Sequence, residues 1–195
     1  MSEGKRIGLL GGSFNPAHKG HLHITFGALN RLKLDEVWWM VSPQNPLKAA
    51  SSMGNLEFRM KSAKELAEDP RIVVTDIESQ MGTVYTVDTL EALKKKFPKH
   101  KFVWLMGADN LRQIPKWRGW QRIFRMGPIA IFPRPSYSRR ALAGKASRRF
   151  RRFQIKPTRA PRLATMRAPA WVFLRTQPNT TSATRIRARL ARKNG

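Results

Sequence analysis

The chain has 195 residues, of which 41% are hydrophobic, and this combination is typical of one folded domain and excludes a disordered chain. It has no cysteine, no signal-peptide pattern and no apolar run near the roughly 20 residues that span a bilayer, which excludes a disulfide framework and a thiolate metal site. The formal net charge is +26, and residues 110–195 hold 23 Lys and Arg without one acid, which favours a polyanionic partner. We therefore expect one cytoplasmic domain over residues 1–195, with no membrane partner.

Short apolar runs alternate with helical patterns along the whole chain. The expected strands are 6–11, 36–41, 71–78, 101–107, 128–133 and 171–176. The expected helices are about 21–34, 54–69, 86–97, a broken one within 110–126, then 138–150 and 183–193. Strands that are apolar throughout suit a sheet covered on both faces, and the alternation makes that sheet mostly parallel. The prediction is an α/β doubly wound sheet that binds ligands beyond the carboxyl ends of its strands. The segment from Ser136 to Arg167 has the poorest pattern, and we expect it to be partly mobile.

The loop after the first strand, "GGSFNPAHKGHL" at residues 11–22, has the composition of a phosphate cradle. It joins a strand end to a helix start, where free N–H groups and the helix dipole suit an anion. Gly11, Gly12 and Gly20 permit close approach to the backbone, and Pro16 stiffens the turn. The spacing matches neither the P-loop nor the dinucleotide-binding pattern of glycines.

Two histidines, His18 and His21, lie three residues apart at the start of the expected helix. Imidazoles at this spacing can converge on one object and donate hydrogen bonds to phosphate oxygens. A lone histidine is more often structural, and we interpret His23 in that way. A zinc site would need further ligands, and the only remaining histidine is His100 in a lysine-rich loop, so we expect no protein-bound metal.

The segment "GGSFNPAHKGH" resembles the signature of the H-x-G-H nucleotidylyltransferase superfamily, and within it the chain resembles the bacterial nicotinate-nucleotide adenylyltransferases. Five further motifs occur in the order that this family shows: "SPQNPLK", "YTVDTL", "LMGADNL", "PKWRGW" and "TSATRIRARL". The resemblance covers residues 6–190 apart from the segment from Ser136 to Arg167. It implies a Rossmann-like nucleotidylyltransferase fold.

The resemblance also implies a reaction in NAD biosynthesis. AMP would pass from ATP to nicotinate mononucleotide, giving deamido-NAD and pyrophosphate, by in-line attack on the α-phosphorus. The partners would be ATP and nicotinate mononucleotide, with Mg²⁺ carried by the phosphates of ATP. We expect no specific nucleic acid, and a homo-oligomer remains open.

Roles for individual residues follow from motif position within the resemblance. His18, His21 and Arg187 would be catalytic. ATP would be bound by Gly11, Gly12, Ser13, Phe14, Gly107, Asp109, Ser182 and Thr184. The mononucleotide would be bound by Asn45, Lys48, Thr86, Trp117 and Arg118. Among these, Asp109 would accept a ribose hydroxyl, Trp117 would stack on the nicotinate ring, and backbone N–H groups near Thr86 and Arg118 would read its carboxylate. Residues 180–195 would close the ATP phosphate site, and Trp120 is expected in the core.

The chain departs from the family pattern at three places. It has Asn15 where aspartate is common, Ala183 and Arg185 where serine and aspartate are frequent, and a shortened "NPLK" that weakens the assignment of Asn45 and Lys48. Two alternatives stay open at this point. One is a related transferase with nicotinamide mononucleotide or phosphopantetheine as acceptor. The other is a nucleic-acid binder that uses the "RRFRRF" cluster at 148–153.

Overall fold

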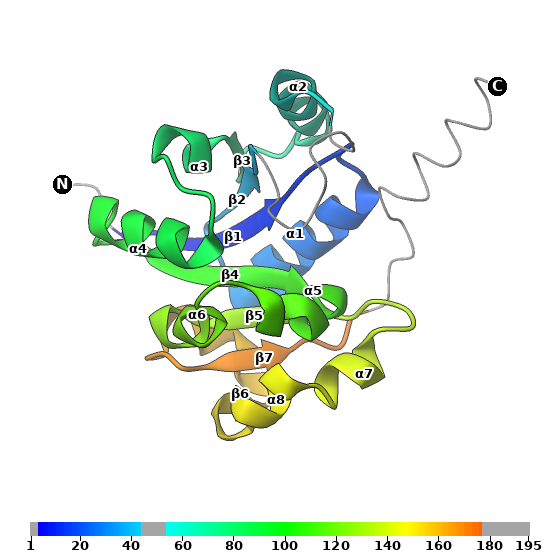
Figure 1. Cartoon of the computed structure of the whole chain (residues 1–195), viewed down its shortest axis with the longest axis vertical. Coiled ribbons are helices and arrows are strands. Elements are labelled where there is room, and N and C mark those ends of the chain that lie inside the picture. Colours follow the sequence, from blue (N-terminus) through cyan, green and yellow to red (C-terminus); the bar gives the residue numbers. More distant parts are fainter. Residues whose placement is uncertain (1–3, 44–53, 177–195) are drawn as a thin grey trace.

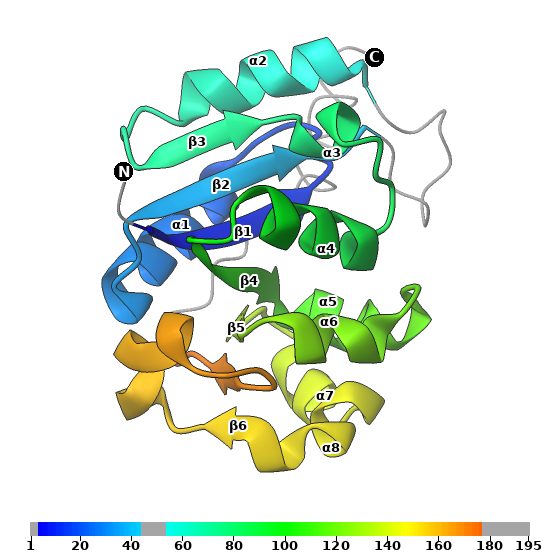
Figure 2. The same cartoon turned by 90° about the vertical axis from the view of Figure 1, so that its left-hand side faces the viewer.

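The structure is a computed structural model that describes residues 4–43 and 54–176. Within them, seven parallel strands form one sheet in the order β3-β2-β1-β4-β5-β7-β6 (Figures 1 and 2). The strands are β1 (Arg6–Gly12), β2 (Glu36–Val41), β3 (Ile72–Thr75), β4 (Lys101–Gly107), β5 (Ile129–Phe132), β6 (Gln154–Ile155) and β7 (Trp171–Phe173). This confirms the predicted doubly wound α/β class.

Helices cover both faces of the sheet (Figure 2). One face packs against α1 (Lys19–Leu32), α2 (Leu56–Leu66) and the 3₁₀ segment η4 (Pro157–Thr165). The other face packs against α3 (Ile77–Gln80), α4 (Thr86–Lys96), α5 (Ala108–Gln113), α6 (Trp120–Met126), α7 (Ser138–Leu142) and α8 (Lys145–Arg149). Two further 3₁₀ turns are η2 (Ile114–Lys116) and η3 (Arg151–Phe153). Among the helices of the described residues, none has the length and apolar character needed to cross a bilayer.

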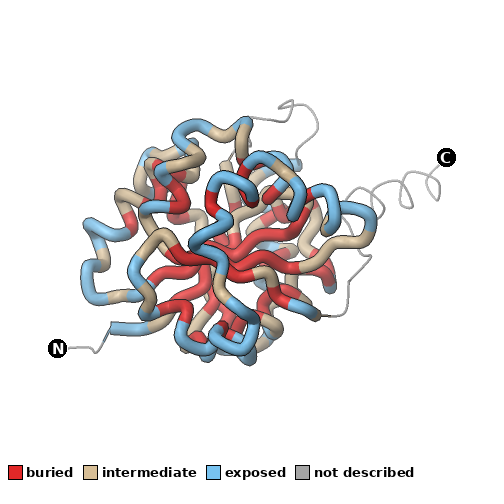
Figure 3. The backbone as a smooth tube through the Cα atoms, turned by 90° about the horizontal axis from the view of Figure 1, so that it is seen from below, coloured by how far each residue is buried: buried red, intermediate tan, exposed pale blue. Residues whose placement is uncertain are grey.

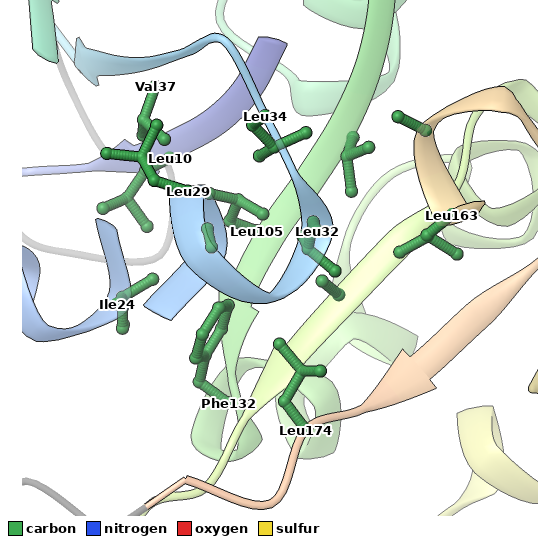
Figure 4. Close-up of a cluster of buried hydrophobic side chains, with 14 of the residues drawn as sticks. Leu10, Ile24, Leu29, Leu32, Leu34, Val37, Leu105, Phe132, Leu163 and Leu174 are labelled. Atoms are coloured by element: carbon green, nitrogen blue, oxygen red, sulfur yellow. The ribbon is translucent and has the colours of Figure 1, made fainter. Parts of the chain in front are cut away.

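Each strand sends alternate side chains to two separate cores. In β1, Leu10 packs on the α1 side, while Ile7 and Leu9 pack on the α4 side. Figure 4 shows the first core, where Leu29 of α1 and Leu163 of η4 meet the sheet. The buried backbone therefore gathers in the strands at the centre of the molecule, and exposed loops surround it (Figure 3).

The central strand β1 is the point where the strand order reverses. It pairs with β2 on one side and with β4 on the other. Chain segments leaving the carboxyl ends of β1 and β4 therefore diverge to opposite faces, and this leaves a crevice of the kind that binds ligands in open α/β sheets.

Several sequence predictions were wrong in detail. The strand expected over 71–78 ends at Thr75, and Ile77 begins the short helix α3. The helix expected over 138–150 is broken into α7 and α8, because Gly144 lies between them and has an extended φ/ψ of −78° and 170°. Strand β6 was missed because it has only two residues and follows a run of arginines. The helix expected over 183–193 lies outside the described residues.

The segment from Ser136 to Arg167, expected to be partly mobile, instead packs against the rest of the fold. In η4, Ala160, Leu163 and Ala164 are buried among exposed cations. The apolar residues are spaced by three and four positions, so one face of the segment can join the core although its composition is dominated by arginine.

Candidate active site

A cavity of about 470 Å³ lies at the carboxyl ends of β1 and β4. Ten residues of the predicted site line it: Gly11, Gly12, Ser13, Phe14, His21, Thr86, Gly107, Asp109, Trp117 and Arg118. A second cavity of about 460 Å³ lies where β4 and β5 begin, and its lining includes none of the predicted residues. The fold thus brings motifs from four separate parts of the chain to the crevice predicted for the ligand.

The glycine-rich loop follows β1 directly and packs tightly. At Gly11 a Cβ atom would lie 2.8 Å from Cη2 of Trp104, so the requirement for glycine comes from this ring of β4. Phe14 adopts a φ of 45°, a conformation that costs a non-glycine residue of the order of 1 kcal/mol. Its buried ring lies 4.4 Å from the His21 ring and 5.3 Å from Trp39, measured between centroids. The aromatic contacts hold the loop in its strained shape.

The two histidines of the motif are joined at the start of α1. His18 is the N-cap, and its Nδ1 accepts the backbone N–H of Gly20 at 3.1 Å. His21 reaches back, and its Nδ1 accepts the backbone N–H of His18 at 3.1 Å. Their ring centroids lie 4.0 Å apart. Because both Nδ1 atoms accept hydrogen bonds, the ring proton of each neutral imidazole is on Nε2, which is left as a donor for a ligand.

Both imidazoles are held in the neutral form when no ligand is bound. Burial, together with the positive charge of Arg134, lowers the pKa of His18 to about 4. Burial lowers the pKa of His21 well below its ordinary value, and His18 and Arg134 lower it further. At neutral pH the pair therefore offers hydrogen bonds without positive charge. His18 is only 7% exposed, and within the cavity lining only His21 of this pair is present.

The opposite wall of the phosphate loop is formed by the ends of β4 and β5. Asp109 lies in the first turn of α5, and its Oδ1 would be 2.3 Å from a Cβ atom at position 107, so any side chain there would displace the Asp109 carboxylate. Arg134 follows β5 and lines the same cavity, with its Nε 3.8 Å from Oδ1 of Asp109. Sequence reasoning missed Arg134, although its position just beyond a strand end was a usable signal.

The acceptor side of the cavity is built around the start of α4. Thr86 begins this helix, and Trp117 follows η2 on a neighbouring turn. The Arg118 guanidinium lies 4.8 Å from the centre of the Tyr85 ring, and its Nη1 is 3.4 Å from Asp88 Oδ2. These contacts fix the loop that carries Trp117 against the α4 terminus. Trp120 packs against Phe124 and Phe150 and is partly buried, in agreement with the expected core role.

Glu78 is a second residue that sequence reasoning missed. It is 4% exposed and lines the cavity. The Ser42 hydroxyl donates to its Oε2 at 2.6 Å, and the Thr89 hydroxyl donates to its Oε1 at 3.3 Å. Burial raises its pKa, whereas the two hydroxyl donors oppose that shift. Glu78 thereby ties the end of β2 to α4.

The remaining predicted residues are placed as follows. Asn45, Lys48, Ser182, Thr184 and Arg187 lie outside the described residues. His23 lies partly buried in α1, and His100 accepts the backbone N–H of Lys5 and stacks on Phe97, away from the cavity. Within residues 4–43 and 54–176 no group of three His, Cys, Asp or Glu side chains could hold a metal ion.

Comparison with known proteins shows the family to which the chain belongs. The cytidylyltransferase-like family model matches residues 9–189. A "probable nicotinate-nucleotide adenylyltransferase" of Parvibaculum lavamentivorans is 50% identical over 189 residues, covering 97% of this chain and 94% of that protein. One with the same description from Gluconobacter oxydans is 50% identical over 183 residues, covering 93% of each chain. The chain therefore belongs to the cytidylyltransferase-like family. Within that family, these relatives confirm the resemblance to the bacterial nicotinate-nucleotide adenylyltransferases.

Solved structures support the fold. The nicotinic acid mononucleotide adenylyltransferase of Plasmodium falciparum, complexed with NaAD, superposes with a TM-score of 0.70 at 17% identity. The match covers 94% of this chain and 83% of that one. At this identity the likeness establishes the Rossmann-like nucleotidylyltransferase fold.

Proposed function

We propose that this protein transfers AMP from ATP to nicotinate mononucleotide, giving deamido-NAD and pyrophosphate, as an enzyme of NAD biosynthesis. One observation carries the proposal: a single cavity joins the glycine and histidine loop after β1 to the Trp117 wall beside α4. A nucleotide phosphate at the loop and a pyridine ring at the indole would therefore share one space. The relatives at 50% identity carry the same activity in their descriptions.

The reaction needs positioning and charge stabilisation more than a covalent nucleophile. A phosphate oxygen of the mononucleotide forms a bond to the α-phosphorus of ATP, and the bond from that phosphorus to the bridging oxygen breaks, so that pyrophosphate leaves with the electron pair. The Nε2–H groups of His18 and His21 would donate to phosphate oxygens on which charge develops. Their Nδ1 atoms are already satisfied by the backbone, so the rings need no reorganisation during the reaction.

Magnesium would fit this site as an ion coordinated mainly by the phosphates of the bound nucleotide. Glu78 and Asp109 are the carboxylates of the cavity lining. Glu78 accepts hydrogen bonds from the hydroxyls of Ser42 and Thr89, and Asp109 lies near the Arg134 guanidinium. The donors left for Mg²⁺ are mainly phosphate oxygens, which the ion prefers together with water. When bound there, the ion would offset the negative charge of the triphosphate.

The acid form of the mononucleotide is favoured by the hydrogen-bond donors around the ring subsite. Thr86 is at the amino terminus of α4, an eleven-residue helix with free N–H groups, and Arg118 lies beside it. Such donors suit a carboxylate better than a carboxamide, which needs both a donor and an acceptor.

Several finer expectations remain predictions. They are the phosphate contacts of Asn45, Lys48, Ser182, Thr184 and Arg187, the closing of the ATP site by residues 180–195, the single-domain extent of 1–195, a cytoplasmic location and any homo-oligomer.

The test is pyrophosphate release from ATP and Mg²⁺ with three acceptors in parallel: nicotinate mononucleotide, nicotinamide mononucleotide and phosphopantetheine. We expect release to prefer the nicotinate substrate and to collapse in His21→Ala, with Trp120→Phe as the aromatic control away from the phosphate loop. A preference for another acceptor would support the same class of reaction but show that the substrate is different from the one proposed. Folded wild-type protein that releases no pyrophosphate with any acceptor would overturn the proposal.

A further inference from the structure

Arg59 is a buried arginine that holds three segments of the site together. It lies in α2, is 1% exposed, and donates from Nε to the carbonyl of Gly54 at 2.8 Å. Its Nη1 donates to the carbonyls of Ser13 at 2.8 Å and Ser42 at 2.7 Å, and its Nη2 donates to that of Pro43 at 3.1 Å. Ser13 belongs to the phosphate loop, and Ser42 and Pro43 follow β2. One side chain thus fixes the loop after β1 against the end of the neighbouring strand.

The charge of Arg59 has no acidic partner. Within the described residues no carboxylate lies within ion-pair distance of its guanidinium. The sequence has no Asp or Glu between Glu36 and Glu57, so residues 44–53 bring no acid to it. Burial lowers the pKa of Arg59, which reflects the cost of keeping a cation out of water. Glu78 is connected to it only through Ser42.

Four carbonyl dipoles accept hydrogen bonds from Arg59, which has five N–H donors, and they leave its net charge in place. A buried cation without a counter-ion is destabilising unless an anion is supplied from elsewhere. The ligand proposed for this cavity is strongly anionic, and the loop that would bind its phosphates is the loop that Arg59 contacts. The missing negative charge is therefore the charge that a substrate brings.

The peptide geometry of the loop adds a second consequence. In a trans peptide the C=O and the next N–H point in opposite directions, and the Ser13–Phe14 bond is not among the cis bonds of the described chain. Arg59 draws the Ser13 carbonyl toward α2. The N–H of Phe14 consequently points away from α2, and Phe14 itself lines the cavity.

We propose that Arg59 is a positioning residue: it turns the Phe14 amide toward the substrate phosphates, and those phosphates supply the counter-charge that its buried guanidinium lacks. This inference rests on the proposed function, because it takes phosphates to be the ligands of the loop. It assigns to α2 a part in phosphate binding although no α2 side chain lines the cavity. Substrate binding and the stability of this region are therefore coupled through one residue.

Two variants separate the charge of Arg59 from its shape. Arg59→Lys keeps a cation and loses the planar fork, whereas Arg59→Met keeps an unbranched side chain and loses the charge. The matched control is Arg6→Met, because Arg6 also makes several hydrogen bonds but pairs with Asp35 at the start of β1. Each protein is titrated with pyrophosphate and, separately, with uncharged adenosine, and binding is followed by thermal unfolding.

Loss of the charge should weaken pyrophosphate binding by on the order of tenfold in Arg59→Met, with adenosine binding unchanged within about twofold. Arg59→Lys should keep pyrophosphate affinity within a few-fold but lose most of kcat, because the Phe14 amide is no longer fixed. Arg6→Met should change neither ligand's affinity. If Arg59→Met weakened the binding of pyrophosphate and of adenosine equally, Arg59 would have a structural role alone and the inference would be overturned.

The outcomes also distinguish the inference from the proposed function. Wild-type protein that binds pyrophosphate in an Arg59-dependent way but transfers no AMP would sink the function and keep the anion coupling. AMP transfer by the wild-type protein, together with an unchanged pyrophosphate affinity in Arg59→Met, would support the proposed function and overturn the role of Arg59. If the methionine variant does not fold, Arg59→Lys decides, and wild-type kcat in that variant overturns the positioning role.

Discussion

Cations near the amino ends of the parallel strands have different partners from those near the carboxyl ends. Where the strands begin, cations have acidic partners: Arg6 binds Asp35 at 2.7 Å, Lys5 binds Glu36, and Arg71 binds Asp69 at 2.7 Å. Where the strands end, the Arg59 guanidinium donates to backbone carbonyls and, among the described residues, to no carboxylate, while Arg134 Nε lies 3.8 Å from Asp109 Oδ1. The first three cations are balanced within the protein at the starts of β1, β2 and β3, whereas Arg59 has no acidic partner among the described residues, and we propose that an anionic ligand balances its charge.

The difference explains how one sheet serves both stability and catalysis. Exposed ion pairs at the amino ends contribute about 0–1 kcal/mol each and can be lost without touching the site. Groups at the carboxyl ends are instead held in costly states: two neutral imidazoles, a residue at positive φ and, among the described residues, a buried guanidinium without a carboxylate partner. Such strain is tolerated where it prepares a site for its ligand.

The largest expected effect at the carboxyl end is the loss of His18. Replacing it in His18→Ala removes an Nε2–H donor and the acceptor for the Gly20 amide. We expect kcat to fall by about 10²- to 10³-fold, as for other transition-state donors, and stability to fall by only about 1 kcal/mol for the lost cap. Steady-state pyrophosphate release and chemical denaturation measure the two numbers. A variant that loses stability but retains turnover would show that the histidine serves α1 alone.

The pH dependence of stability gives the next largest effect. The folded protein protonates His18 at about pH 4, whereas the unfolded chain does so near pH 6.5. Between these values the unfolded state binds more protons, so the free energy of unfolding falls as the pH is lowered from about 6.5 to 4. The loss due to His18 is about 3 kcal/mol, at roughly 1.36 kcal/mol per pKa unit, and His18→Ala should flatten the curve.

NMR titration of the imidazole signals tests the same point directly. Without ligand the His18 signal should titrate near pH 4, and addition of ATP should raise this pKa because negative phosphates favour the protonated ring. A titration near pH 6.5 in the free protein would contradict the buried, neutral pair.

A smaller effect is expected on the acceptor side. In Trp117→Ala the KM for nicotinate mononucleotide should rise by roughly ten- to a hundredfold, since stacking on an aromatic ring is worth about 1–3 kcal/mol. The KM for ATP should change by less than about twofold. Trp117→Phe is the control, because it keeps an aromatic face. An unchanged KM for the mononucleotide in the alanine variant would place the pyridine ring elsewhere.

Sequence reasoning predicted the fold class because buried parallel strands are apolar throughout and repeat regularly. It failed where the signal was short or masked, as in the two residues of β6 and in η4, whose three buried residues are hidden among arginines. Predicted site residues that the structure brings together belong to short contiguous motifs where strands end and helices begin, such as the one from Gly11 to His21.

The residues that were missed share a different property. Arg59, Glu78 and Arg134 act through contacts with distant segments, and none of them belongs to a recognisable motif. From the sequence alone, a helical arginine such as Arg59 cannot be distinguished from one that is exposed to solvent. Only its burial against the carbonyls of Ser13 and Ser42 reveals its place in the site.

The smallest effect is expected at the amino end, in Arg6→Ala. Asp35 accepts two hydrogen bonds from the Arg6 guanidinium and one from its backbone N–H, and the pair is more than a third exposed. Solvent screening limits the loss to about 1 kcal/mol in the free energy of unfolding, because the backbone bond survives the substitution. Both kcat and KM should stay at wild-type values, since the pair lies at the opposite end of β1 from the cavity. A fall in kcat at unchanged stability would mean that charge at the two ends of the sheet is coupled, and the division of labour between them would have to be abandoned.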